Sequence, residues 1–377
     1  MIRLKAIRGK QGNLDYFVTT ATYGEVARIV NYKEQVKGWP PALQQQRPLN
    51  MSRVRNDMVP YLIENEDHFY NALVVEHVRP GDTQHDVKFV PDQDDPTCGW
   101  VELAGSEQLE ALDGQHRLKS IELAVAEQPD LAKETIAMVI VPHRRVDDSQ
   151  QLFSDLNRNA KPTPKSLNIL FEHREEAALL SKALAQKSKY LAGRVNLTGS
   201  NLSARSPYLV TISTLYEAVR IMKGILAGDF DAKEAKLVEY WDAALGSLPG
   251  MSALDSGQLS PAEIRNTYIY STGLGFEALG DTINVAVTTH PAKWRELLTE
   301  GLPRIPWELA QTQIWEGVAL FAGRIAIARA ARRRTATLVK YLLGLPVEDR
   351  DLEELKEEGY KPLNRKLPSP VLVPEAV

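Results

Sequence analysis

The sequence predicts an α+β core that extends to about residue 185, followed by a mostly helical domain. In the first half of the chain, short runs with strand periodicity alternate with runs of helical spacing. From about residue 206 onward, strand signals become sparse and apolar residues recur at helical intervals. The chain has 377 residues, of which 44% are hydrophobic. It is therefore long enough to bury a sizeable core, and wholesale disorder is excluded.

The elements expected in the first half are short and of both types. Apolar runs bounded by turn residues predict strands over 73–78, 86–90, 100–103 and 135–141. Apolar residues three or four positions apart predict helices over 52–66, from about 115 to near Pro129, over 149–156 and over 166–187. Ser166 is expected to cap the last of these helices.

The second half is expected to be helical, with breaks at Gly and Pro. The predicted helices cover 207–226, 232–245, 261–278 and 305–343. Within them, Thr272-Gly273-Leu274-Gly275-Phe276 is glycine-rich but matches no phosphate-loop pattern, so we expect a site where a helix packs or breaks. The last 17 residues contain four prolines and predict an extended tail that does not pack. The predicted division is a core over 1–185, a helical domain over 186–358 and a tail over 359–377.

Composition excludes several classes of protein. The net charge of −4 excludes a globally basic surface for nucleic acid, although a local basic patch is compatible with it. A single cysteine, Cys98, cannot form an internal disulfide or a cysteine-based zinc site. The sequence shows no continuous apolar leader and no run of about 18 apolar residues. We therefore expect a cytoplasmic protein without a membrane partner.

The most informative segment is Asp113-Gly114-Gln115-His116-Arg117. A strand is expected to end at Asp113 and a helix to begin near Gln115, with Gly114 permitting a positive φ between them. The first N–H groups of a helix have no internal acceptor and favour an anion. Gln115, His116 and Arg117 add side-chain donors at the same end. This geometry suits a phosphate group.

Asp113 does not fit a simple phosphate site, because a carboxylate repels a phosphate. Mg²⁺ could bridge the two, or Asp113 could accept a proton from an attacking hydroxyl group or water. In the alternative interpretation Asp113 is only a helix cap, Gly114 a turn glycine, and the other three residues a solvated first turn. The residues alone leave both interpretations open.

Three segments together resemble the DGQHR-domain family, whose best-known member is DndB of DNA phosphorothioation (sulfur modification) systems. They are the pentapeptide at 113–117, QRPLNMSRVRNDMVPYLIEN at 46–65, and FSDLNRNAKPTPKSLNILFEHRE at 153–175. The resemblance is good over about 44–185. It implies a core similar to the ParB/sulfiredoxin-like fold, in which the corresponding turn binds nucleotide phosphates.

The resemblance implies ATP or another nucleoside triphosphate, with Mg²⁺, at this turn. Gly114, Gln115, His116 and Arg117 would contact phosphate, and Asp113 would lie near the reacting centre or the metal. Further candidate phosphate-binding residues are Arg47, Arg53, Asn157, Arg158, Asn159 and Lys161. The alternatives are an exposed helix start for the first two and a capped helix end with a solvated loop for the other four.

A basic stretch between Gly317 and Val347 contains no acidic residue. Its candidate DNA-binding residues, expected on one helix, are Arg324, Arg329, Arg332, Arg333 and Arg334. A helix with these arginines would give a local positive field that a duplex could use. A solvated basic face is the alternative, since the arginines spread around the helix and apolar residues lie among them.

Three functions follow from these expectations. The first is a DndB-like component of a DNA modification system that binds double-stranded DNA through its helical half and a nucleoside triphosphate at the turn. It would work with other proteins of the system, and self-association is left open. The second is a transcriptional regulator that binds DNA without nucleotide. The third is a Mg²⁺-dependent ATPase that serves deazaguanine-type DNA base modification.

Overall fold

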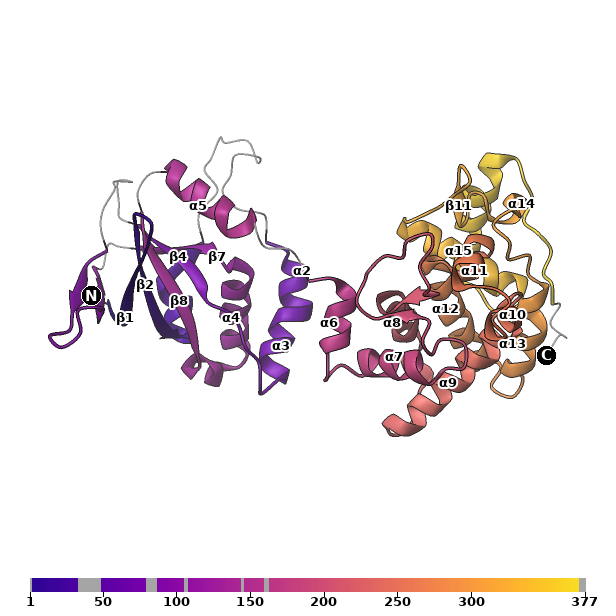
Figure 1. Ribbon diagram of the computed structural model, residues 1–377, viewed down its shortest axis with the longest axis horizontal. Coiled ribbons are helices and arrows are strands. Elements are labelled where there is room, and N and C mark those ends of the chain that lie inside the picture. Colours follow the sequence, from indigo (N-terminus) through magenta and orange to yellow (C-terminus); the bar gives the residue numbers. More distant parts are fainter. Residues whose placement is uncertain are drawn as a thin grey trace. The chain divides into compact units, whose positions relative to one another are not determined.

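The computed structural model describes residues 2–32, 49–78, 87–104, 108–143, 146–158 and 163–372 (Figure 1). The chain forms two compact units, 1–161 (unit 1) and 162–377 (unit 2). The division lies before the boundary at residue 185 that the sequence predicts. Helices α6 (Lys165–Phe171) and α7 (Glu176–Lys187) pack on α8 (Ile212–Ile221) and so belong to unit 2.

Unit 1 is built on a mixed eight-stranded sheet in the order β3-β7-β4-β8-β2-β1-β6-β5. The strands are β1 (Ile2–Gln11), β2 (Leu14–Thr22), β3 (Val30–Tyr32), β4 (Leu73–Val78), β5 (Phe89–Pro91), β6 (Cys98–Leu103), β7 (Gln108–Asp113) and β8 (Thr135–Pro142). The β3–β7 and β4–β8 pairs are parallel, and the other neighbours are antiparallel. The four predicted strands are confirmed as β4, β5, β6 and β8, within a few residues.

Sequence analysis missed the long hairpin of β1 and β2. Leu4 and Ala6 alternate with exposed residues along β1, and Phe17 and Ala21 are buried on β2. The connection is the dipeptide Gly12-Asn13, with Gly12 at φ 58°. Alternation on both sides of a two-residue Gly-Asn turn is a hairpin signal, and it was present in the sequence.

Helices α1, α3 and α4 cover one face of this sheet. The helical segments of unit 1 are α1 (Tyr23–Ile29), α2 (Met51–Arg53), a π-helical turn (Val54–Met58), α3 (Val59–Glu64), α4 (Gln115–Glu127), a 3₁₀ turn (Pro129–Lys133) and α5 (Val146–Arg158). Both α1 and α3 pack on α4, and Figure 1 shows α3 and α4 side by side. Leu118, Ile121 and Ala124 of α4 are fully buried in this core, as their spacing predicts. The predicted helix 52–66 is confirmed as the segment from α2 to α3.

Glu76 of β4 ties α5 to the sheet. The side chains of Leu73 and Val75 lie in the helix-covered core, and strand alternation directs Glu76 to the opposite face. There the buried Glu76 carboxylate accepts a hydrogen bond from the Ser149 hydroxyl group of α5 and lies 2.9 Å from Nδ1 of His143. This buried polar cluster fixes the position of α5.

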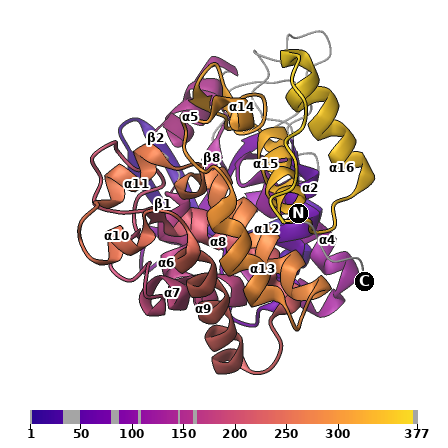
Figure 2. The same cartoon turned by 90° about the vertical axis from the view of Figure 1, so that its right-hand side faces the viewer.

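Unit 2 is helical around α12. Its helices are α6, α7, α8, α9 (Phe230–Ser247), α10 (Met251–Asp255), α11 (Pro261–Thr267), α12 (Gly273–Thr289), α13 (Trp294–Gly301), α14 (Thr312–Trp315), α15 (Arg329–Leu342) and α16 (Asp349–Glu354). Its 3₁₀ turns are Met222–Ile225, Ile269–Ser271, Leu302–Arg304 and Lys361–Leu363, with a π-helical turn at Leu355–Tyr360. Figure 2 shows α12 among α8, α13 and α15, each of which packs on it. In the core of unit 2, Trp241 stacks on Phe276 and Trp307 stacks on Trp315, with ring centroids 5.7 and 5.6 Å apart, respectively.

Four short strands complete unit 2. They are β9 (Val195–Asn196), β10 (Val210–Thr211), β11 (Leu320–Phe321) and β12 (Arg324–Ile325). The first two pair in parallel, and the last two form a hairpin. No helix in the described ranges has the length and apolar character that a membrane crossing needs.

Two predicted helices are divided in the structure. The segment 166–187 forms α6 and α7, because the Glu172 carboxylate accepts the N–H groups of Arg174 and Glu175 (2.7 and 3.2 Å) and ends the helix there. Ser166 does not cap α6, since Pro164 holds that position and the buried Ser166 hydroxyl donates to the Gly199 carbonyl. The segment 261–278 forms α11 and the start of α12, with Thr272 as the cap of α12.

The helical segment predicted over 305–343 is broken at glycines, as expected, but much of it is not helical and sequence analysis missed a hairpin within it. Only α14 and α15 are helical, and the β11–β12 hairpin lies between them. Gly317 and Gly323 have φ values of 83° and 71°, which end regular helix, and the Glu316 carboxylate accepts the N–H groups at the hairpin turn. The predicted helix 232–245 is confirmed as α9.

The predicted unpacked tail is also wrong for residues up to 372. The Val371 N–H group donates to the Leu342 carbonyl, and the side chains of Val371 and Leu372 pack against the core of unit 2. The Arg365 guanidinium donates to the carbonyls of Thr312 and Glu316. Prolines limit regular secondary structure in the tail to the 3₁₀ turn Lys361–Leu363, but the apolar residues between them still bury part of their side chains.

Candidate functional site

The pentapeptide 113–117 forms the turn between a strand and a helix, as predicted. β7 ends at Asp113, Gly114 has φ 93° and ψ 18°, and α4 begins at Gln115. Gly114 is the N-cap residue of α4, and no side chain caps this helix, so the interpretation of Asp113 as a cap is wrong. Among the described residues, the N–H groups of the first turn thus have no side-chain acceptor, which is the arrangement that binds anions at helix N-termini.

Only glycine fits at position 114. A Cβ atom there would lie 2.4 Å from Cδ2 of Leu73, which is fully buried, and 3.1 Å from Cζ of Arg117. The positive φ is itself unfavourable for any other residue. Gly114 therefore permits both the turn and the close approach of α4 to β4.

Arg117 fastens this turn to the chain segment before β4. Its Nη1 donates to the carbonyls of Asn71 (2.7 Å) and Ala72 (2.6 Å), and its Nη2 donates to Oδ2 of Asp113 (2.6 Å). The side chain of Arg117 is only 13% exposed, whereas that of Asp113 is 41% exposed. Arg117 thus orients Asp113, and the carboxylate neutralises the guanidinium. Contact between Arg117 and a phosphate stays a prediction.

His116 joins the turn to the segment 49–53. The Asn50 N–H group donates to Nε2 of His116 (3.0 Å), so in the neutral ring the proton lies on Nδ1. Burial, and secondly the Arg53 guanidinium, lower the pKa of His116, which favours this neutral form. Oδ1 of Asn50 also accepts the Arg53 N–H group and caps α2. The predicted proximity of this segment to the turn is therefore observed.

A pocket of about 440 Å³ lies at the turn. It is lined by Arg53, Met58, Tyr70, Asn71, Leu112, Asp113, Gly114, Gln115, His116, Arg117 and Phe153. Arg53 is exposed and has no carboxylate partner in the described ranges. Because Asp113 already neutralises Arg117, Arg53 and the N-terminus of α4 leave the pocket positive.

Two aromatic residues of the pocket were missed by sequence analysis. The Tyr70 hydroxyl group lies 3.1 Å from Ser120 Oγ and 3.3 Å from the Met58 carbonyl, and burial raises its pKa. Phe153 comes from α5, which Glu76 holds on the sheet. Tyr70 directly precedes the segment that Arg117 binds, but this relation is not visible in the sequence.

The lining fits a magnesium nucleotide only if phosphates hold most of the metal. Asp113 is the single carboxylate among the lining residues, and the described residues contain no cluster of three or more His, Cys, Asp or Glu residues able to hold a metal. Mg²⁺ commonly binds one or two carboxylates together with substrate phosphates and water. Asp113 would supply the protein ligand of such an ion.

Several predicted site residues lie outside the described residues. They are Arg47, Asn159 and Lys161, together with the side chains of Asn157 and Arg158 at the end of α5. Their proposed closure over the phosphates stays a prediction.

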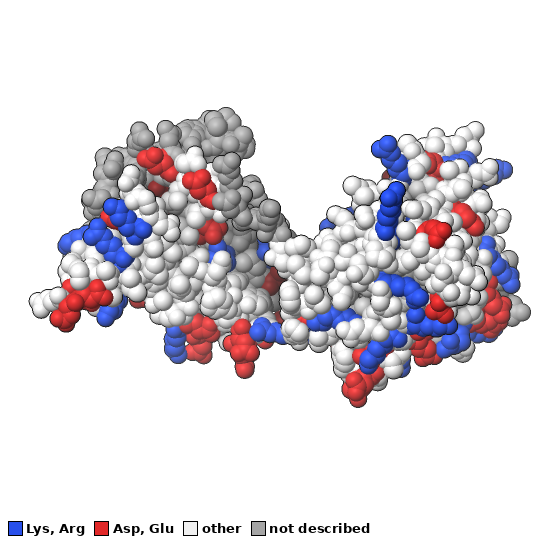
Figure 3. All heavy atoms as spheres, viewed as in Figure 1, with Lys and Arg blue, Asp and Glu red and all other residues white. Residues whose placement is uncertain are grey.

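The five candidate DNA-binding arginines do not share one helix. Arg324 lies in the β11–β12 hairpin and Arg329 begins α15. Arg332 pairs with Glu277, while Arg333 and Arg334 pair with Glu354 and Glu358. These acidic partners lie outside the stretch 317–347, so its local sequence overstates the positive field. Figure 3 shows basic and acidic side chains interspersed on the visible face of unit 2.

Comparison with protein families gives one finding. A family model described as DndB, DNA-sulfur modification-associated, matches residues 4–346, which include the pocket of unit 1 and most of unit 2. No curated protein and no solved structure matches the chain.

Proposed function

Since the chain belongs to the DndB family of DNA-sulfur modification-associated proteins, we propose that the pocket of unit 1 binds the phosphates of ATP or another nucleoside triphosphate. The observation that carries this proposal is the uncapped N-terminus of α4 in a pocket that also contains Arg53, which has no carboxylate partner among the described residues. Its volume of about 440 Å³ lies in the range of small-molecule sites. We further propose that unit 1 is related to ParB/sulfiredoxin-like domains through this turn.

Each residue of the pocket has a distinct role in this proposal. The N–H groups of the first turn of α4 hold a phosphate, and Arg53 supplies a second set of donors and a positive charge. Arg117 keeps the Asp113 carboxylate in place beside the phosphates. Mg²⁺, when bound, would neutralise phosphate charge between them. Tyr70 and Phe153 offer aromatic surface for the nucleobase.

Binding of duplex DNA is proposed for Arg324 and Arg329 of unit 2. Both are exposed, and neither has a carboxylate partner within the described ranges. Arg332, Arg333 and Arg334 are already paired, so they add less to the field around DNA. In this proposal the nucleotide state of unit 1 biases the binding of DNA or of other proteins of the modification system.

Binding of Mg-ATP to the full chain tests the nucleotide site. Arg53→Gln removes a charge from the pocket, and Arg55→Gln removes the same charge from an exposed residue outside it. We expect Arg53→Gln to weaken binding about 10- to 100-fold, since a hydrogen bond to a charged group is worth roughly 1.5–3 kcal/mol. Equal affinity in the two variants, measured by calorimetry, would contradict the site.

Two further assays separate the proposed role from its alternatives. ATP-dependent change in the anisotropy of a labelled duplex supports nucleotide control of DNA binding, whereas salt-dependent binding that ATP leaves unchanged indicates a nucleotide-independent regulator. Multiple-turnover phosphate release that Asp113→Asn abolishes indicates an ATPase. An Arg324→Gln/Arg329→Gln variant should bind the duplex more weakly than Arg55→Gln.

A further inference from the structure

Unit 2 contains a second polar cavity, of about 520 Å³. Its lining includes Thr211, Thr214, Arg265, Thr272, Gly273 and Arg332. None of these lining residues is acidic, two are arginines, and most of the others carry hydroxyl or amide groups. Such a lining has many donors and a positive charge.

Arg265 brings an unneutralised charge to the cavity. Its Nη1 donates to the carbonyls of Ser206 and Tyr208, and its Nη2 donates to those of Ser203 and Ala204. All four acceptors are neutral, and no carboxylate pairs with Arg265 in the described part of the chain. Burial lowers the pKa of this guanidinium, which indicates that its charge is poorly solvated. An anion in the cavity would compensate this charge.

Two parallel helices direct their N-termini to the same cavity. A Cβ atom on Gly273, at the start of α12, would lie 3.9 Å from Oγ1 of Thr214 in the first turn of α8. A Cβ atom on Gly280, further along α12, would lie 2.7 Å from the Ala218 carbonyl of α8. The two helices therefore run in the same direction. Their dipoles add rather than cancel, and both positive ends lie at the cavity. Thr211 and Thr272 cap the two helices by accepting the third N–H group of each first turn, and the first two N–H groups have no side-chain acceptor among the described residues.

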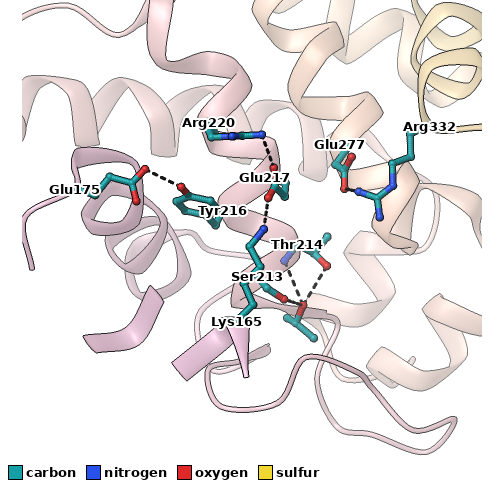
Figure 4. Close-up of polar contacts among 10 residues, drawn as sticks. Lys165, Glu175, Ser213, Thr214, Tyr216, Glu217, Arg220, Glu277 and Arg332 are labelled. Carbon is teal, nitrogen blue, oxygen red and sulfur yellow. Dashed lines mark hydrogen bonds and ion pairs between the residues drawn. The ribbon is translucent and has the colours of Figure 1, made fainter. Parts of the chain in front are cut away.

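The carboxylates closest to this region are already engaged. Figure 4 shows Glu277 paired with Arg332, and Glu217 between Lys165 and Arg220. Burial raises the pKa of Glu217, but the Lys165 ammonium and the surrounding guanidinium groups outweigh this effect and lower it. Arg265 and Arg332 are the charged residues of the lining, and Glu277 neutralises Arg332, so one positive charge remains at the cavity before the helix dipoles are considered.

We propose that this cavity of unit 2 binds a phosphate group, held by the free N–H groups in the first turns of α8 and α12, the Thr214 hydroxyl group and Arg332, whose guanidinium would be shared with Glu277. The phosphate would come from a nucleotide or from a nucleic-acid backbone, which share this chemistry. The site is separate from the pocket of unit 1, because all of its lining residues belong to unit 2. Its existence does not depend on nucleotide binding at Gly114.

Gly273 allows a test that does not weaken the fold. It is exposed, its φ is not positive, and a Cβ atom there would meet only Thr214, at ordinary contact distance. Gly273→Asp places a carboxylate at the cavity, where it repels a phosphate but favours the N-terminus of α12. Gly273→Asn introduces a side chain of the same shape without the charge, and is the matched control.

The first experiment compares hydrogen exchange of the full chain in sodium phosphate and in sodium chloride of equal ionic strength. We expect phosphate to slow exchange in the first turns of α8 and α12 in wild type and Gly273→Asn. Gly273→Asp should lose this protection, because its affinity for phosphate should be at least about tenfold lower than that of wild type. Arg332→Gln should show reduced protection. Equal protection in the Asp and Asn variants, or no protection in wild type, would refute the proposal.

The second experiment identifies the source of the phosphate. ATP and a labelled duplex are titrated against the two Gly273 variants and Arg53→Gln. If Gly273→Asp alone loses affinity for the duplex, the cavity binds a phosphate of the nucleic-acid backbone. If Gly273→Asp alone loses affinity for ATP, the cavity binds the phosphate of a nucleotide. Loss of ATP affinity in Arg53→Gln alone concerns the pocket of unit 1, so the two proposals can fail separately. If Gly273→Asp matches Gly273→Asn for phosphate, ATP and duplex, the cavity is not a phosphate site.

Discussion

Replacement of Gly114 by alanine tests whether the turn at the end of β7 is specified by space as well as by backbone conformation. The backbone at this position has φ 93°, which costs an L-residue about 1–2 kcal/mol. The added Cβ would also lie 2.4 Å from Cδ2 of the buried Leu73. Overpacking of this kind costs about 1–3 kcal/mol. We therefore expect Gly114→Ala to destabilise unit 1 by about 2–5 kcal/mol.

Gly12→Ala is the control for the backbone contribution. Gly12, in the turn between β1 and β2, has φ 58°, and no heavy atom lies within 4 Å of a Cβ placed there. Its replacement should therefore cost only about 1–2 kcal/mol. Both positions lie in unit 1, so the difference between the two variants isolates the collision with Leu73.

Native-state hydrogen exchange of the full chain measures this difference locally. Peptides from β7 and α4 report the opening of the turn, and each 1.4 kcal/mol of destabilisation speeds exchange about tenfold. Gly114→Ala should accelerate their exchange by roughly 30-fold to a few thousand-fold. If Gly114→Ala and Gly12→Ala accelerate the exchange of these peptides equally, the Leu73 side chain moves away from the new Cβ atom without loss of stability. The collision with Leu73 would then not contribute to the requirement for glycine at position 114.

Three further changes have defined outcomes. Because burial lowers the pKa of His116, the unfolded chain takes up a proton near pH 6.5 while the folded ring stays neutral. The stability that this residue contributes should be complete above pH 6.5 and fall as the pH drops toward the folded pKa. The free energy of unfolding, measured by urea titration at several pH values, should therefore depend less steeply on pH in His116→Gln than in wild type. Arg117→Lys, which cannot reach three acceptors in a fork, should cost unit 1 about 1–3 kcal/mol in urea, and an unchanged midpoint would contradict the fastening role. Deletion of residues 364–377 should lower the melting temperature of unit 2 by calorimetry, since it removes Leu372 from the core; no change would show that the tail adds no stability.

The sequence predicts the turn correctly because its determinants are local. A strand, a glycine and a helix follow one another within a few residues, and each has its own periodicity or conformational preference. The same holds for β8, which is a nearly continuous apolar run, and for β4, which begins with three apolar residues. The uncapped N-terminus of α4 follows directly from glycine at the cap position.

The partners of the charged residues could not be predicted, because they are distant in the sequence. Arg117 meets the carbonyl of Asn71, 46 residues away, and this contact makes it part of the scaffold. Arg332 meets Glu277, 55 residues away, so a stretch without acidic residues is still neutralised in the fold. Composition within a segment determines its charge, but only tertiary structure determines which charges remain unpaired.

The distribution of tryptophan makes the two units spectroscopically unequal. Four of the six tryptophans, at positions 241, 294, 307 and 315, belong to unit 2. The indoles of Trp307 and Trp315 are stacked with centroids 5.6 Å apart, close enough for their electronic transitions to couple. Intrinsic emission and the aromatic circular dichroism of this protein therefore report mainly on unit 2. A change in either signal when nucleotide is added would indicate that unit 2 itself responds to the ligand.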